Sequence, residues 1–305
     1  MRLTRKKLAI AVLVCAAVIA LIVTLSPDNE PSYQGKKLSQ WIESDHGRTG
    51  AFTRPELQEI NRPEIQAVRT IGTNALPFLL NWIRYEPSPS KAKRVLAQIL
   101  ERFGLEIWSD PGAVRANRAA AGFAMLGPVA SPAIPELAKL ASASSGSETP
   151  RVATYALVAI GPTALPALVE VIKNTNAVAR YDAVSDLNYA LRKFGADAYP
   201  ILIECLDDAD PKVALEAADA LAEAGVEPAI VCVKITRHFH HPDWLQRLRA
   251  LQIVGRYRGQ AREPTRTIVP DLVARLADTN SIVRKQAESL LRRVAPEVLT
   301  NVPAP

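Results

Sequence analysis

Three histidines and an aspartate stand together in "RHFHHPDW", from Arg237 to Trp244. Clustered imidazoles beside a carboxylate are ligands that Zn²⁺ and Cu²⁺ accept. No fourth ligand with the spacing of a structural zinc site accompanies them. The stretch also falls between two helical patterns, where a turn needs only polar residues. We expect such a turn, with metal binding or weak pH sensitivity as the alternatives, and we assign no metal ion and no cofactor.

Three carboxylates lie within five residues in "DDADP", Asp207 to Pro211. Carboxylate oxygens bind Ca²⁺, but this stretch lacks the central glycine and the distal glutamate of an EF-hand loop. It also directly precedes a helical pattern, where an aspartate satisfies the first backbone N–H groups. The sequence therefore favours helix capping over a calcium site.

No pattern of an activated nucleophile, a catalytic zinc helix or a phosphate-binding glycine loop occurs in the chain, so we predict that the protein is not an enzyme. Cys205 and Cys232 fall in successive helical segments. Outside the cytoplasm they could form a disulfide, or both could be small buried hydrophobic residues.

A motif in which a glycine is followed by a proline recurs along the chain. In "AIGPTALPALVEVI", Ala159 to Ile172, a glycine precedes a proline by five positions. The same interval separates three pairs, Gly72/Pro77, Gly161/Pro166 and Gly195/Pro200, and looser copies are Gly127/Pro135 and Gly225/Pro228. Gly127, Gly161 and Gly195 are 34 residues apart. A fixed period in the thirties indicates a repeat architecture.

Each copy predicts a pair of helices. Apolar residues recur at helical spacing before the glycine, which can take a positive φ and end the first helix. The proline lacks an N–H group and suits the first turn of the second helix. One pair cannot bury its apolar face, so neighbouring pairs must share a core. We expect an all-α fold, an α-solenoid over residues 61–299, with a tail at 300–305.

The repeated pattern D-P-x-V…A…A-L…G…P-x-L resembles HEAT repeats. It stands in "DPKVALEAADALAEAG" and in "TNSIVRKQAESLL", whose Val283–Arg284 pair is typical of a first helix in that family. "PSYQGKKLSQWIES", Pro31 to Ser44, is similar to the segment that precedes the repeats in membrane-anchored bacterial HEAT-repeat proteins. The resemblance implies a scaffold that binds other macromolecules.

The N-terminus predicts a membrane anchor. Four cations, Arg2, Arg5, Lys6 and Lys7, precede an apolar run over residues 8–25. That run is near the lower limit for spanning a bilayer, which is about 17 residues. A cleaved signal peptide and a buried helix are the alternatives. Since the cation-rich flank stays in the cytoplasm, we expect residues 1–25 to anchor the chain in the cytoplasmic membrane as a single-pass segment. The repeats then lie outside, after a linker over residues 26–60 that contains one short amphipathic helix at Leu38–Ile42.

Two sets of side chains are candidates for partner binding. The second helices are expected to line a concave surface, where the fourth residue after each proline forms a polar track; these residues are Asn81, Lys139, Glu170 and Glu204. The second set comes from the C-terminal third, where twelve Arg and Lys stand against six Asp and Glu. Its candidate residues are Arg247, Arg249, Arg256 and Arg258. A solvated face is the alternative for this basic set, and an anionic surface is the partner it suggests.

From these features we expect a membrane-anchored scaffold that binds unknown proteins on the extracytoplasmic side. Nucleic acid is an unexpected partner in that compartment. The alternatives are a HEAT-like lyase or nucleic-acid-processing module that faces the cytoplasm, and a structural element of the cell envelope.

Overall fold

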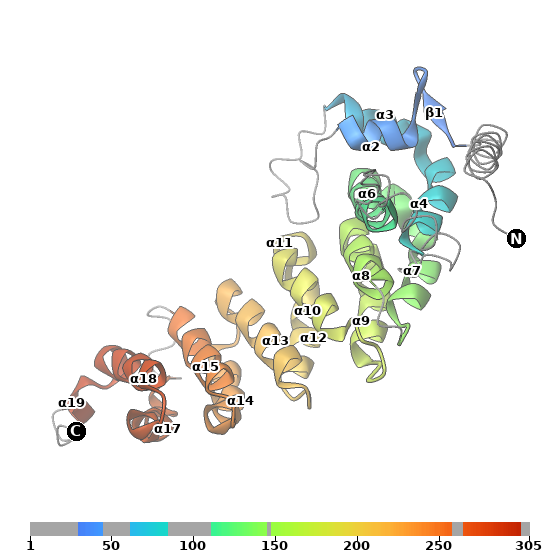
Figure 1. Cartoon of the computed structure of the whole chain (residues 1–305). Helices are drawn as coiled ribbons and strands as arrows, with labels where there is room; N and C mark the ends of the chain where they lie inside the picture. Colours follow the sequence, from blue (N-terminus) through green and yellow to red (C-terminus); the bar gives the residue numbers. More distant parts are fainter. Residues whose placement is uncertain (1–29, 45–61, 85–110, 145–147, 258–264, 300–305) are drawn as a thin grey trace, which may run out of the picture.

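The computed structural model describes residues 30–44, 62–84, 111–144, 148–257 and 265–299. About four fifths of these residues, 81%, lie in helices, so the expected all-α class is confirmed. Figure 1 shows the helices side by side in one elongated, bent row. No helix within the described ranges has the length and apolar character to cross a bilayer. The span expected over residues 8–25 and the tail at 300–305 lie outside those ranges.

The helices alternate along the chain between two layers. We call one set the first helices: α3 (Pro63–Ile71), α6 (Pro111–Leu126), α8 (Thr149–Ile160), α10 (Arg180–Tyr189), α13 (Pro211–Ala224), α15 (Trp244–Arg256) and α18 (Ser281–Val294). The second helices are α4 (Leu76–Ile83), α7 (Ile134–Ala141), α9 (Leu165–Lys173), α12 (Tyr199–Cys205), α14 (Pro228–Ile235) and α17 (Val269–Ala274). Two short helices, α11 (Leu191–Phe194) and α19 (Pro296–Leu299), follow α10 and α18.

A first helix and the second helix after it form one unit, and the units stack in sequence order. Each first helix from α6 to α18 packs on the next first helix, in the order α6, α8, α10, α13, α15, α18. The buried residues of all units join in one continuous apolar cluster. No unit could bury its own apolar face alone, because each contributes only two helices.

The connections within the units explain the glycine and proline pattern. Gly72, Gly127, Gly161, Gly195 and Gly225 all have positive φ, as their positions predicted. Short 3-10 turns follow most of them, including Gly72–Ala75, Pro162–Ala164 and Gly195–Ala198. The second helix then begins one residue before the proline in five units, so the proline occupies its second position. Only in α14 is the proline the first residue of the described second helix.

A buried alanine marks the same turn in four units. Ala75, Ala133, Ala164 and Ala198 each stand two residues before the proline and are at most 2% exposed. Because interiors are packed closely, a larger side chain in this tight turn would force the two helices of the unit apart.

The expected short helix is present as α2 (Leu38–Ser44), but part of the expected linker is a hairpin. Strands β1 (Ser32–Tyr33) and β2 (Lys36–Lys37) pair through a turn in which Gln34 and Gly35 have positive φ. The indole nitrogen of Trp41 donates to the backbone oxygen of Tyr33 at 3.0 Å. Helix α2 packs on α3 and α6, so this segment covers the first end of the row.

Candidate functional site

The four polar residues that the sequence assigned to the second helices lie on the surface. Asn81, Lys139, Glu170 and Glu204 are all exposed. Ala274 occupies the corresponding position of α17 and is also exposed. These positions line one solvent-facing edge of successive second helices, which we call the second-helix track.

The track departs from its expected register in α14. Cys232, four residues after Pro228, is buried, and Val233 is 57% exposed instead. The reason is that α14 begins at its proline, with Glu227 in the left-handed region before it. The other second helices begin one residue earlier relative to proline, so the outward position in α14 moves by one residue.

The sequence predicted that the second helices line the concave side of the row, and Figure 1 shows that this prediction is wrong. There the row of helices bends, and first helices such as α8, α13 and α18 lie on the inner side. The second helices α7, α14 and α17 lie on the outer side. The track is therefore an outer surface, and the first helices face the inside of the bend.

Ion pairs connect neighbouring units along the second helices. Lys173 lies 2.9 Å from the carboxylate of Glu204, and Lys234 lies 2.5 Å from that of Asp207. Lys139 and Glu170 make no ion pair with any described residue. These two side chains therefore keep their charges available to a partner.

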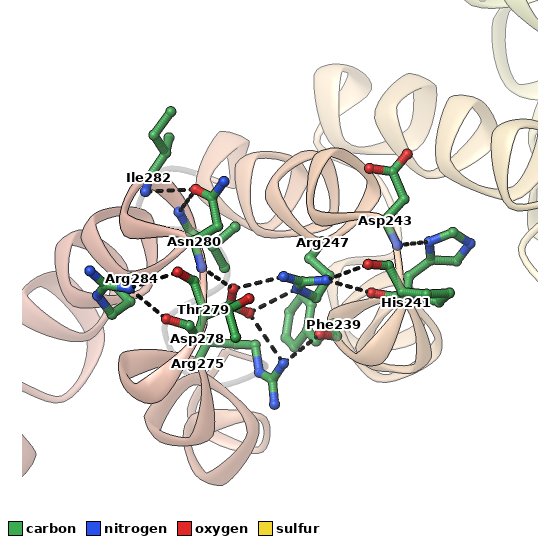
Figure 2. A network of polar contacts seen from close by, with 12 residues as sticks. Phe239, His241, Asp243, Arg247, Arg275, Asp278, Thr279, Asn280, Ile282 and Arg284 are labelled. Atoms are coloured by element: carbon green, nitrogen blue, oxygen red, sulfur yellow. Dashed lines mark hydrogen bonds and ion pairs between the residues drawn. The ribbon is translucent and has the colours of Figure 1, made fainter.

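Arg247 does not belong to an exposed basic face. It is 8% exposed, and its guanidinium donates two hydrogen bonds of 2.8 Å to the two oxygens of the Asp278 carboxylate (Figure 2). The remaining terminal nitrogen donates to the backbone oxygens of His241 and Pro242 at 2.8 and 3.0 Å. Burial alone would raise the pKa of Asp278, but the hydrogen bonds from Arg247 and the Asn280 N–H outweigh it and hold that pKa below its ordinary value. Arg247 joins the start of its unit to the turn that ends it, and four of its five N–H donors are used in these contacts.

The neighbouring arginines are also engaged. Arg249 pairs with the buried carboxylate of Glu216. Arg256 lies 2.6 Å from the carboxylate of Asp219 and 3.9 Å from that of Glu223. Arg258 lies outside the described residues. Arg249 and Arg256 are thus paired with acids of the preceding unit, and Arg247 with an acid of its own unit.

A groove of about 440 Å³ crosses the first helices α13, α15 and α18. Its polar lining consists of Glu223, Gln252, Arg256, Gln286 and Arg293. Gly255 completes it where α15 approaches α18. Sequence reasoning missed this groove because its residues come from three helices. The signal available was a glycine inside a helical pattern, which often marks a close approach.

The histidine cluster forms the polar turn that its position predicted. His238 is buried, and burial, together with the nearby Arg237 and His241, lowers its pKa to about 4. Its Nε2 accepts a hydrogen bond from Arg237 at 3.1 Å. His240 instead faces Asp271, at 3.7 Å, and His241 accepts from the backbone N–H of Asp243. The three imidazoles therefore serve separate contacts.

The aspartate-rich turn caps a helix, as predicted. Asp210 accepts a hydrogen bond of 2.9 Å from the N–H of Lys212 at the start of α13. Asp207 and Asp208 pair with Lys234 and Arg180. Among the described residues, no group of three or more His, Cys, Asp or Glu side chains is arranged to hold a metal ion.

The thiols of Cys205 and Cys232 are free and buried. Burial raises the pKa of Cys205 to about 12 and also raises that of Cys232. The disulfide considered from their spacing is therefore absent, and both residues act as small components of the core.

One buried carboxylate forms no ion pair with any residue of the described ranges. Asp186 of α10 is 8% exposed and accepts a hydrogen bond of 3.2 Å from the hydroxyl of Thr154 on α8. Burial, assisted by the neighbouring Asp182, raises its pKa to about 7, against the opposing effects of the Thr154 hydrogen bond and Arg151. This carboxylate lies between two units and titrates near neutral pH.

No protein-family model matches the chain, and no curated protein is similar to it. Among solved structures, the chain is similar to an engineered protein with a known crystal structure, at 19% sequence identity and a TM-score of 0.41. The similarity covers 84% of this chain and 68% of the engineered one. At this TM-score and identity it assigns neither a fold nor a function.

Proposed function

We propose that the chain is a HEAT-like α-solenoid that acts as a membrane-anchored scaffold for other proteins on the extracytoplasmic side. A solenoid is a row of units in which each contacts only its neighbours. Such a row offers long, continuous surfaces in place of one deep cleft, and long surfaces suit macromolecular partners.

The observation that supports the proposal is a series of side-chain contacts, each between residues that are about one unit apart in the sequence. The hydroxyl of Thr154 reaches Asp186, 32 residues later, and Arg249 pairs with Glu216, 33 residues earlier. The hydroxyl of Tyr257 donates to the backbone oxygen of Val226 at 2.7 Å, across 31 residues. These polar groups are thus used in stacking one unit on the next, while Asn81, Lys139 and Glu170 of the exposed second-helix track are left for a partner.

The membrane anchor and its orientation rest on the sequence. Cations before an apolar run favour a cytoplasmic N-terminus, so the units would lie on the other side. A HEAT-like enzyme, lyase-like or nucleic-acid-processing, that faces the cytoplasm would need the opposite orientation. A structural element of the cell envelope would share the orientation but would have no discrete partner.

Two fusions test the compartment. Alkaline phosphatase and a green fluorescent protein, each fused after Pro305 of the full-length chain, report opposite sides of a bacterial membrane. We expect phosphatase activity and no fluorescence. Fluorescence without phosphatase activity would overturn the extracytoplasmic scaffold and favour the cytoplasmic alternative.

Co-purification tests partner binding. The full-length chain is cross-linked in cells, extracted in detergent and compared with the double variant K139E/E170K. Because both side chains are exposed, the variant should keep the helix content and the melting temperature of the parent. We expect at least one co-purifying protein to be lost from the double variant, and an unchanged set of proteins would contradict the proposed track.

A further inference from the structure

The groove across α13, α15 and α18 differs in chemistry from an apolar ligand pocket. Its described lining has two glutamines, two arginines and one glutamate, and lacks aromatic and large aliphatic side chains. Sites for drug-sized molecules are lined predominantly by apolar and aromatic groups. The occupant that fits here must therefore supply many hydrogen-bonding groups of its own.

Two side-chain amides without a protein partner among the described residues line this groove. Gln252 comes from α15 and Gln286 from α18, and neither side chain makes a hydrogen bond to a described residue. A glutamine amide both donates and accepts. Each unit of a polypeptide main chain likewise offers one N–H and one C=O. The two glutamines therefore match an extended main chain that crosses the groove.

The two arginines of the groove are not equivalent. Arg256 is already paired with Asp219 and Glu223. Arg293 is exposed and has no ion pair among the described residues. One of its nitrogens donates to the backbone oxygen of Gly255 at 3.2 Å. A guanidinium has five donors, so Arg293 can still bind a carboxylate through two parallel hydrogen bonds.

Gly255 keeps the groove open. It lies within α15, where a glycine is less favourable than alanine. A Cβ built at this position would lie 3.4 Å from Leu290 Cδ2 and 3.6 Å from Gln286 Nε2. Those are ordinary contact distances, so a larger side chain can be accommodated by the backbone but would extend into the groove.

The dimensions suit a short extended segment. Packed helix axes are about 8–10 Å apart, so three adjacent helices span about 16–20 Å. At about 3.3 Å per residue, an extended chain covers that span with five or six residues.

We propose that this groove binds an extended peptide segment of a partner protein, with the peptide main chain on Gln252 and Gln286 and one acidic side chain on Arg293. This rests on the proposed scaffold function and names the chemistry of the partner. A single uncompensated cation favours one carboxylate. A nucleic acid strand needs several cations along its phosphates, and Glu223 at the same groove would repel it.

An arrayed peptide library tests the proposal with the full-length chain in detergent. The probes are seven-residue peptides with acetylated and amidated ends, which removes their terminal charges. Glutamate is placed at each position in turn, and the best binders are measured again in solution by fluorescence anisotropy. We expect glutamate to be enriched at one position of the bound peptides.

Three variants make the result specific. R293Q should lower the affinity about tenfold, since a hydrogen bond to a charged group contributes roughly that factor, and should abolish the preference for glutamate. The matched control is R292Q, because Arg292 is exposed, precedes Arg293 and pairs with Glu288 outside the groove lining; its affinity should stay within about twofold of the parent. G255L should abolish binding while retaining helix content, since leucine favours a helix more than glycine.

Several results would overturn the proposal. One is that G255L binds the peptides as tightly as the parent does. Another is that no peptide binds the parent more tightly than it binds G255L. The third is that an octathymidylate binds more tightly than the best peptide. If G255L does not fold, the double variant Q252A/Q286A replaces it with the same expected loss. Failure of these tests, with partners still co-purifying through Lys139 and Glu170, would remove the groove proposal and leave the scaffold function intact.

Discussion

Arg247 and Asp278 form a bidentate ion pair inside the row of helices, with both nitrogen–oxygen distances at 2.8 Å. The two residues are 31 positions apart, one at the start of a unit and the other at the turn that ends it (Figure 2). A second pair, Arg180 with Asp208, has the same arrangement in an earlier unit. In both units an arginine near the start of the first helix is thus paired with an aspartate in the turn after the second helix.

Removing Arg247 should be strongly destabilising. R247M removes the bidentate partner of the buried Asp278 carboxylate and leaves it only the 3.3 Å contact with Arg275. Breaking a buried pair costs up to about 3–5 kcal/mol, so we expect a loss within that limit. The free energy of unfolding is measured by urea denaturation followed by circular dichroism. R292M is the matched control, because its pair with Glu288 is exposed and contributes less than about 1 kcal/mol. Equal effects of the two substitutions would show that the Arg247 pair is not a stabilising contact.

Gly161 should not tolerate a side chain. Its φ of 107° and ψ of −157° fall in a region essentially restricted to glycine. A Cβ there would also lie 3.0 Å from the Cε of Lys193, whose ammonium donates to the backbone oxygens of Val158 and Ala159. We expect G161A to lower the free energy of unfolding by about 1–3 kcal/mol.

The control for Gly161 is Gly225, which lies in the left-handed helical region at φ 70° and ψ 23°. Asparagine occurs at such helix ends, so G225N should cost less than G161A. A larger loss for G225N would contradict the assignment of strain to Gly161.

The stability of the chain should depend on Asp186 and pH. Its pKa is about 7 in the folded state, raised mainly by burial, while an unfolded aspartate has a pKa of about 4. Between these values the folded state binds more protons than the unfolded state, so this residue makes stability fall as pH rises from about 4 to about 7.

The variant D186N removes that titration and keeps an oxygen for the Thr154 hydroxyl. Its stability relative to the parent should rise between pH 4.5 and pH 8 by about 2–4 kcal/mol, at about 1.4 kcal/mol per pKa unit. Urea unfolding at both pH values measures the difference, with D197N, on an exposed turn, as the control. A difference between D186N and the parent that is the same at both pH values would contradict the assignment.

Local rules explain what the sequence predicted well. A positive φ at glycine and the missing N–H of proline act on the residues beside them, so the ends of helices could be placed from Gly161 and Pro166 alone. Helix capping by an aspartate of "DDADP" could be predicted for the same reason, because capping involves only the next few residues, and the structure identifies Asp210 as the cap.

Contacts between units could not be predicted in the same way. The sequence shows that Arg247 is basic, but its neutralisation depends on Asp278, which is brought close only by the stacking of the helices. The exposed position of α14 moved from Cys232 to Val233 because the helix starts at Pro228 and not before it. A shift of one residue turns a side chain by about 100° around a helix, which is enough to exchange surface for core.

Site-specific photocross-linking in intact cells tests the scaffold function most directly. A photoreactive amino acid replaces Asn81, Lys139 or Glu170 in the full-length chain, and Asp197 on an exposed turn serves as the control position. We predict that at least two of the three track positions cross-link to the same protein and that position 197 does not. The absence of any adduct from the track, or the same adducts from position 197, would contradict the proposal that this surface binds a partner.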